Sequence, residues 1–304
     1  MKLRRLIIIA IILGLSLNLT GGCQQRPTPE TFIDDMGRQI TLDEVPQRIV
    51  SHVPSITETL FALDLGERVV GVSDYCNYPE EARSKPSIGG YYGPSIENII
   101  AQNPDLVLTD GEGVNQDIIP VLEGLGVACV VIAPKDIEGI LNDIELLGGI
   151  TGSEKRAEEM VSEIRNRLDK IVSQVEGTPR VKVLYIYDAT DLNYPWTAGP
   201  GSFADALVAM AGGENIAADT EAAWAQISIE VILSANPEVI IVDASMGTAM
   251  VLVEELKAHP VWRETAAVKS NRIHIIDGDL VNRSGPRIAQ GLEEIARSIH
   301  PELF

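Results

Sequence analysis

The feature that most constrains the fold of this chain is a sixteen-residue pattern that occurs twice. Residues 95–110 read SIENIIAQNPDLVLTD and residues 228–243 read SIEVILSANPEVIIVD, with seven identical positions. Each copy holds a helix-like segment, an Asn-Pro break and an apolar run, an order that predicts a helix, a turn and a buried strand. The sequence therefore predicts the same α/β unit once in each half of the chain.

Strand-like and helix-like segments alternate around these two copies. Besides the repeat copies, the candidate strands are 48–53, 68–74, 127–133, 181–188 and 272–277, and the candidate helices are 55–66, 115–126, 202–212 and 284–300. Such alternation is typical of mostly parallel sheets with helices on both faces.

One long segment, residues 153–175, interrupts the alternation. It lacks Gly and Pro and carries apolar side chains at helical spacing, which predicts a rod of roughly 33 Å. The apolar stripe consists of Ala157, Met160, Val161, Ile164, Leu168, Ile171 and Val172.

These segments divide the chain into two lobes, and its length also suits two domains better than one. We expect an α/β protein with two parallel-sheet lobes joined by one long rigid α-helix, and a ligand cleft between the lobes. The expected parts are a tether and hairpin over 23–46, an N-terminal lobe over 47–152, a linking helix over 153–176 and a C-terminal lobe over 177–304.

The first 22 residues have the composition of an export signal. A basic start precedes an apolar run over residues 6–19, and the segment LTGGC then ends at Cys23. This order is typical of a secretory signal, and the Cys directly after Gly22 indicates a lipoprotein signal in which Cys23 carries the lipid. The alternative is an uncleaved amino-terminal anchor. Either interpretation places the remaining chain outside the cytoplasm.

Charge and motifs exclude several classes of function. Without the three basic residues of the signal, 21 Lys and Arg stand against 44 Asp and Glu, a net charge of about −23. Such a surface repels nucleic acid, so no nucleic-acid role is expected. The sequence has no GxSxG, GxxxxGK[ST] or HExxH motif, no GxGxxG after a strand, and no metal-site spacing among its four histidines. We expect no enzyme, no cofactor and no metal site.

Two cysteines remain after Cys23. An exported pair could form a disulfide, but Cys129 lies in the apolar run VACVVIA. Two buried free thiols, Cys76 and Cys129, are therefore the favoured interpretation.

The aromatic residues gather in segments that resemble loops. Tyr75 and Tyr91 lie in a stretch with Tyr78, Tyr92 and several glycines, whereas Trp196 follows a predicted strand and Trp224 precedes the second repeat helix. Ligands of parallel α/β sheets bind at loops beyond the carboxyl ends of the strands. Aromatic loops in both lobes predict a cleft for a large planar ligand. For Tyr78, covering the edge of a lobe is the favoured interpretation.

Charged residues cluster before the final helix. Asp279, Arg283 and Arg287 lie in GDLVNRSGPRI, where donors at a helix start could hold amide or anionic groups of a ligand. The alternative for Arg287 is a surface ion pair and helix cap.

Several of these motifs together resemble one family. DDMGRQITL, the following PQRIVSHVPSITETLFALDLGERVVGVSD, the NPDLVL junction and AGGENI are similar to the helical-backbone class of substrate-binding proteins of ABC importers. The resemblance covers nearly all of the mature chain and is strongest to cobalamin-binding members. It implies a lipid-anchored extracytoplasmic receptor, acting as a monomer, that delivers a corrinoid to an ABC permease dimer in the membrane.

The resemblance also implies roles for individual residues. It assigns ligand contacts to Tyr75, Tyr91, Trp196, Trp224, Asp279 and Arg283. Tyr91 stands where cobalamin-binding members have a Trp. Asp110 stands where the cobalamin-binding members of the enteric type have a further Trp. These departures leave haem or a ferric siderophore as alternative cargo, with Tyr75 or Tyr91 as the iron ligand of a haem. An exported enzyme or a sensor lobe is the alternative from another class.

The repeated glutamates, Glu97 and Glu230, correspond to the family's docking positions. The resemblance implies that each pairs with Arg residues on one of the two membrane subunits. The alternative is that both simply favour the positive first turn of a helix.

Overall fold

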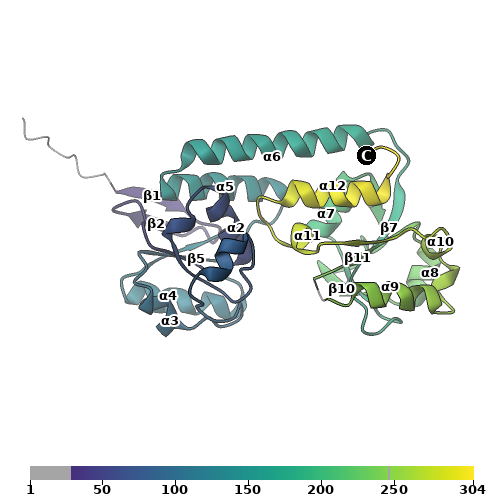
Figure 1. Ribbon diagram of the computed structural model, residues 1–304, viewed down its shortest axis with the longest axis horizontal. Helices are drawn as coiled ribbons and strands as arrows, with labels where there is room; N and C mark the ends of the chain where they lie inside the picture. The colour runs from purple at the N-terminus through teal and green to yellow at the C-terminus, as the bar shows by residue number, and fades with distance from the viewer. Residues whose placement is uncertain (1–28, 246) are drawn as a thin grey trace, which may run out of the picture.

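The computed structural model describes residues 29–245 and 247–304, so the predicted signal, Cys23 and the first residues of the tether lie outside the described residues. Two α/β lobes lie side by side, and one long helix runs along the same edge of both (Figure 1). This arrangement confirms the predicted fold class. Among the described residues, no helix is both long and apolar enough to cross a membrane.

The N-terminal lobe is built on a parallel sheet with strand order β4-β3-β5-β6. An antiparallel hairpin, β1 and β2, precedes it as predicted. The strands are β1 (Glu30–Ile33), β2 (Gln39–Leu42), β3 (Ile49–Ser51), β4 (Val69–Val72), β5 (Leu106–Thr109) and β6 (Ala128–Val131). The helices are α2 (Pro54–Ala62), α3 (Ile96–Ala101), α4 (Ile118–Gly124) and α5 (Ile137–Thr151), with 3-10 turns η1 (Gly66–Arg68), η2 (Glu80–Ser84) and η3 (Gly113–Gln116).

The C-terminal lobe has a mixed sheet with strand order β10-β8-β7-β11-β12, and β9 also pairs with β7. The parallel strands are β7 (Val181–Asp188), β9 (Gly213–Asn215), β11 (Val239–Asp243) and β12 (Ile273–Ile276), whereas β8 (Trp196–Ala198) and β10 (Trp224–Gln226) are antiparallel. The helices are α7 (Phe203–Met210), α8 (Ile229–Ala235), α9 (Ala249–Ala258), α10 (Ala266–Lys269), α11 (Asp279–Asn282) and α12 (Ile288–Ile299), with the turn η4 (Trp262–Glu264).

The linking helix is α6, which spans Glu154–Val175 and packs against α5 and α12 (Figure 1). The predicted apolar stripe is buried except at Val172, which is 37% exposed, and Val175 is buried instead. Val175 lies four residues after Ile171 on the same helix face, whereas Val172 is turned about 100° away from it. On α5, Gly148 permits close packing, because a Cβ there would lie 2.5 Å from the Cβ of Ala157.

The repeat forms equivalent units, α3 with β5 and α8 with β11. Ser95 accepts a hydrogen bond from the backbone N–H of Asn98 at 3.2 Å, and Ser228 accepts one from Val231 at 3.4 Å. After each helix an asparagine adopts the left-handed conformation, with φ of 47° at Asn103 and 51° at Asn236. Asparagine tolerates this conformation better than most residues, which explains its place before the proline in both copies.

The end of the chain differs from the prediction. The helix expected over 284–300 begins only at Ile288, and residues 279–282 form the separate short helix α11. Pro286 explains the break, because proline is confined to the first turn of a helix.

The two cysteines of the described chain are buried free thiols, as predicted. The Cys76 sulfur accepts a hydrogen bond from Thr57 Oγ1 at 3.1 Å, and Cys129 lies in β6.

Candidate functional site

An aromatic cluster lies at the carboxyl end of the N-terminal sheet and is centred on Tyr91. The Tyr91 ring stacks on His52 at 5.7 Å between ring centroids, with Tyr75 at 6.5 Å and Tyr92 at 4.8 Å edge-on. His52 is fully buried, whereas Tyr75 and Tyr92 are 60% and 80% exposed. The structure therefore brings the predicted residues Tyr75 and Tyr91 together. The sequence patterns predict no role for His52, which lies beneath Tyr91.

A second aromatic cluster lies at the carboxyl end of β7 in the C-terminal lobe. The Trp224 ring is tilted over Tyr187 at 5.0 Å and over Tyr185 at 6.5 Å. Trp224 is 39% exposed and Tyr185 only 1%. A buried tyrosine thus supports a half-exposed indole.

The prediction that the two tryptophans lie on loops is wrong. Trp196 lies on β8 and Trp224 on β10, which pair so that Trp196 is opposite Gln226. Since Trp224 and Gln226 are two residues apart on one strand, both indoles point to the same face of the sheet. These two short strands continue the sheet beyond β7 and hold the indoles on a regular surface.

The Tyr91 cluster belongs to the N-terminal lobe and the Trp224 cluster to the C-terminal lobe. Each lobe therefore offers one aromatic wall to the predicted cleft, and the contact of each residue with ligand stays a prediction. Burial raises the pKa of Tyr187, and Asp243 and Tyr92 raise it further.

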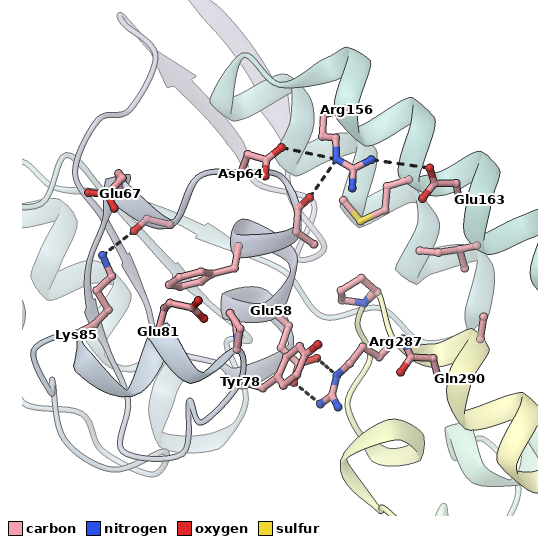
Figure 2. Close-up of a pocket in the computed structure, with 18 of the residues that line it drawn as sticks. Glu58, Asp64, Glu67, Tyr78, Glu81, Lys85, Arg156, Glu163, Arg287 and Gln290 are labelled. Carbon is pink, nitrogen blue, oxygen red and sulfur yellow. Dashed lines mark hydrogen bonds and ion pairs between the residues drawn. The ribbon is translucent and has the colours of Figure 1, made fainter.

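A buried ion network joins the two lobes. Glu58 on α2 accepts two hydrogen bonds from Arg287, at 2.7 and 2.8 Å, and one from Arg283 at 2.8 Å (Figure 2 shows Glu58 and Arg287). The Glu58 side chain is 1% exposed, and those of Arg283 and Arg287 are 14% and 12% exposed. One buried carboxylate of the N-terminal lobe thus holds two guanidinium groups of the C-terminal lobe.

The network engages the two charged residues predicted to contact ligand. Arg283 also donates to Asn77 at 2.8 Å and forms an ion pair with Asp279 at 2.7 Å. Burial raises the pKa of Asp279, and Arg283 opposes that rise. The guanidinium donors of Arg283 are therefore directed at protein partners.

The ion-pair interpretation of Arg287 fits the structure, but the pair is buried between the lobes and is not on the surface. The ring of Tyr78 lies 4.1 Å from the Arg287 guanidinium, a cation–π contact. Tyr78 therefore covers this network. The sequence had predicted instead that Tyr78 covers the edge of a lobe.

A hollow of about 850 Å³ lies on the other side of the network, between α2, η2, α6 and the segment before α12 (Figure 2). It shares Glu58, Tyr78 and Arg287 with the network. Arg156 on its wall is held by the Ala62 carbonyl at 3.2 Å and Asp64 at 3.9 Å. Its lining, as far as the structure describes it, includes Arg287 but neither Asp279 nor Arg283, and none of the aromatic residues predicted to contact ligand. The hollow is therefore distinct from the aromatic cleft.

A buried aspartate lies behind the aromatic cluster of each lobe, Asp110 in the N-terminal lobe and Asp243 in the C-terminal lobe. The two aspartates occupy the same position in the two copies of the repeat. Asp110 is 7% exposed and accepts hydrogen bonds from the Tyr91 hydroxyl and Asn115. Asp243 is 2% exposed and accepts from the Tyr185 hydroxyl at 2.6 Å. Neither aspartate forms an ion pair with any residue in 29–245 or 247–304.

The predicted docking glutamates, Glu97 and Glu230, are exposed in the first turns of α3 and α8, one on each lobe. A hydrogen bond with the Ser228 side chain lowers the pKa of Glu230. Their docking role stays a prediction. In the described part of the chain, no group of three or more His, Cys, Asp or Glu side chains is arranged to hold a metal ion.

Comparisons with known proteins agree on one family. Residues 49–280 match the family described as Periplasmic binding protein. The chain is 31% identical to a Bacillus subtilis protein named Uncharacterized ABC transporter substrate-binding lipoprotein YvrC, over 91% of this chain and 87% of that protein. It is 30% identical to a Halobacterium salinarum protein named Cobalamin-binding protein, over 90% of this chain and 74% of that one.

Solved structures show the same relationship. The periplasmic heme-binding protein RhuT from Roseiflexus sp. RS-1 superposes with a TM-score of 0.75 at 29% identity, covering 85% of this chain and 99% of that one. Its fold, the family match and the two relatives all indicate the same family. The chain therefore belongs to the periplasmic binding protein family, as the extracytoplasmic substrate-binding protein of an ABC importer that works with membrane permease partners.

Proposed function

We propose that this protein binds a corrinoid between its two aromatic walls and delivers it to the permease. The walls present Tyr91 and Trp224, whose flat faces suit a large planar macrocycle. The Halobacterium salinarum relative named for cobalamin binding supports this cargo. The solved heme-binding relative makes haem the principal rival.

The observation that favours a corrinoid over haem is the charge of the cleft. Haem carries two propionate carboxylates, and a buried carboxylate needs a cationic partner. The arginines between the lobes, Arg283 and Arg287, are already paired with Glu58, and the walls contain the buried carboxylates of Asp110 and Asp243. A corrinoid presents neutral amide side chains, which do not require those arginines.

The state of Tyr91 adds a second argument against haem. A tyrosine binds haem iron as its phenolate, so a suitable tyrosine must lose its proton readily. Burial, followed by the hydrogen bond to Asp110, raises the pKa of Tyr91 far above its ordinary value. Tyr91 is therefore a poor iron ligand, which leaves Tyr75 as the remaining candidate for this role.

Delivery requires an anchor and a docking surface. We propose that Cys23 carries the lipid and that Glu97 and Glu230 dock the two lobes on the two permease subunits. The exposure of both glutamates at equivalent helix starts supports this role. The protein acts as a monomer, makes and breaks no covalent bond in its ligand, and needs no cofactor.

Titration calorimetry of the chain lacking residues 1–23 with cyanocobalamin, cobinamide and hemin tests the proposal. We expect tight one-to-one binding of a corrinoid, near nanomolar Kd or about −12 kcal/mol, and weak binding of hemin. Tight hemin binding without a corrinoid signal would reverse the choice of cargo. Turnover of a cleft ligand would instead favour an enzyme.

A further inference from the structure

The repeated unit ends in a buried aspartate in both lobes, and the surroundings of the two side chains are alike. Asp110 directly follows β5, and Asp243 ends β11. Each carboxylate accepts a hydrogen bond from the backbone N–H two residues later, from Glu112 at 3.1 Å and from Ser245 at 2.7 Å. Each also accepts from one tyrosine hydroxyl and one asparagine amide. The similarity of the two halves thus extends from the outer helices into the cleft.

In the N-terminal lobe, the carboxylate holds the outer ring of the wall. Asp110 accepts from the Tyr91 hydroxyl and, at 3.2 Å, from Asn115 Nδ2. The face of the Tyr91 ring lies on His52, whose Nδ1 shares a hydrogen bond of 3.1 Å with Thr109. Tyr91 is therefore fixed both at its hydroxyl and across its face.

In the C-terminal lobe, the carboxylate holds the ring beneath the wall. Asp243 Oδ2 accepts from the Tyr185 hydroxyl and from Asn282 Nδ2, both at 2.6 Å, and Tyr185 lies under Trp224. The chain closes tightly over this carboxylate, because a Cβ at Gly278 would lie 1.9 Å from Asp243 Oδ1. The indole therefore rests partly on a ring that Asp243 anchors, beside the nearer ring of Tyr187 at 5.0 Å.

Core packing alone does not explain a carboxylate at these positions. Burying a charged group costs several kcal/mol unless it is paired or fully hydrogen-bonded. Neither aspartate has an ion-pair partner among the described residues, and hydrogen bonds alone offset the burial. A neutral side chain would avoid that cost, so the carboxylates point to a role beyond filling space.

We propose that Asp110 and Asp243 are paired positioning residues that set the two aromatic walls, and hence the width of the cleft and its selectivity for a flat ligand. The choice of ligand in this inference rests on the proposed function. Asp110 acts through Tyr91, and Asp243 acts through Tyr185 on Trp224. The same position of the repeat thus places one wall in each lobe.

A double-mutant cycle tests the role of Asp110. Asp110→Asn and Tyr91→Phe should each weaken cyanocobalamin binding about tenfold, and the double variant should bind no worse than either single variant. Additive losses in the double variant would show that Asp110 does not act through Tyr91 and would overturn the proposal. Asp117→Asn is the matched control, since Asp117 is exposed in the same region and its side chain makes no cap hydrogen bond within the described chain.

A ligand-free measurement separates this inference from the proposed function. In crystals of the ligand-free protein, the Tyr91 ring of Asp110→Asn should shift from its stacked position on His52, because the carboxylate that holds its hydroxyl is gone. An unmoved Tyr91 ring would contradict the inference even if corrinoids bind tightly. If no corrinoid binds but the ring moves, the cargo is wrong and the positioning role stands.

The C-terminal lobe needs a variant that keeps its core intact. Tyr185→Phe retains the ring and removes only the hydroxyl held by Asp243, so the fold should survive if Asp243→Asn does not. We expect a changed Trp224 emission spectrum and weaker cyanocobalamin binding, by about tenfold. Emission and affinity equal to the parent would exclude a positioning role for Asp243.

Discussion

Replacing Glu58 with glutamine should loosen the connection between the two lobes. In the parent protein the buried carboxylate accepts three hydrogen bonds from Arg283 and Arg287, at 2.7–2.8 Å. Glutamine offers one acceptor oxygen and no charge. The two guanidinium groups then lose the counter-charge of Glu58 in a site that is largely excluded from water. Asp279 still compensates Arg283, so Arg287 carries most of the loss.

The size of the effect follows from this geometry. Removing one partner of a buried ion pair costs about 3–5 kcal/mol, and we expect the lower end, about 3 kcal/mol, because Asp279 and the ring of Tyr78 remain. For a chain of this size, that loss lowers Tm by roughly 6–12 °C.

Urea unfolding and scanning calorimetry of the ligand-free protein measure the loss. Glu67→Gln is the matched control, because Glu67 is exposed on the wall of the neighbouring hollow. If Glu58→Gln unfolds within about 0.5 kcal/mol of the parent, as surface substitutions do, the network does not hold the lobes together.

Three further experiments test the aromatic wall, the docking glutamates and a buried aspartate. Trp224→Ala should weaken corrinoid binding by about 2 kcal/mol or more in calorimetry, and unchanged affinity would remove Trp224 from the wall. Charge reversal at Glu97 and Glu230 should leave calorimetric affinity intact but abolish cobalamin uptake in cells; continued uptake would exclude the docking role. Burial, followed by Asp35, raises the pKa of Asp143 from 3.8 to about 8. Since the folded state binds this proton more tightly than the unfolded state, stability should fall as pH rises from about 4 to 8. Asp143→Asn should therefore be more stable than the parent at pH 8, by a few kcal/mol in urea unfolding, but not at pH 4; equal stability at pH 8 would contradict the raised pKa.

The longest regular elements could be predicted because their hydrophobic pattern repeats over many residues. Helix α6 runs for 22 residues without Gly or Pro, and its apolar stripe is unambiguous. Helix α5 was missed, although it is 15 residues long, because Gly139, Gly148 and Gly149 lower its helical propensity. Its packing against α6 offsets that cost, and packing between distant segments leaves no local signal.

The strands that carry the tryptophans were missed for a related reason. Strands β8 and β10 have only three residues each, which is too short for a period of two to be recognised. They form because β10 pairs with β8 and β8 pairs with β7. The sequence therefore identified Trp196 and Trp224 as candidates but assigned them to the wrong structural context.

The ion network between the lobes could not be predicted from local sequence. Glu58 lies in a helix-like run where it resembles a solvent-facing residue, and Arg283 and Arg287 are 225 and 229 residues away. His52 did leave a signal, because it is a polar residue near the carboxyl end of a predicted strand, the edge where ligands of such sheets bind. Tyr185 lies in the middle of the strand predicted over 181–188 and left no such signal.

The most direct test of the central claim is the position of the cobalt atom in crystals of the protein grown with cyanocobalamin. Anomalous diffraction locates this atom without reference to the rest of the ligand. We predict cobalt between the lobes, with the corrin ring bounded by Tyr91 on one wall and Trp224 on the other. Cobalt in the hollow behind Glu58 and Arg287, or on the outer surface, would contradict the assignment of the cleft.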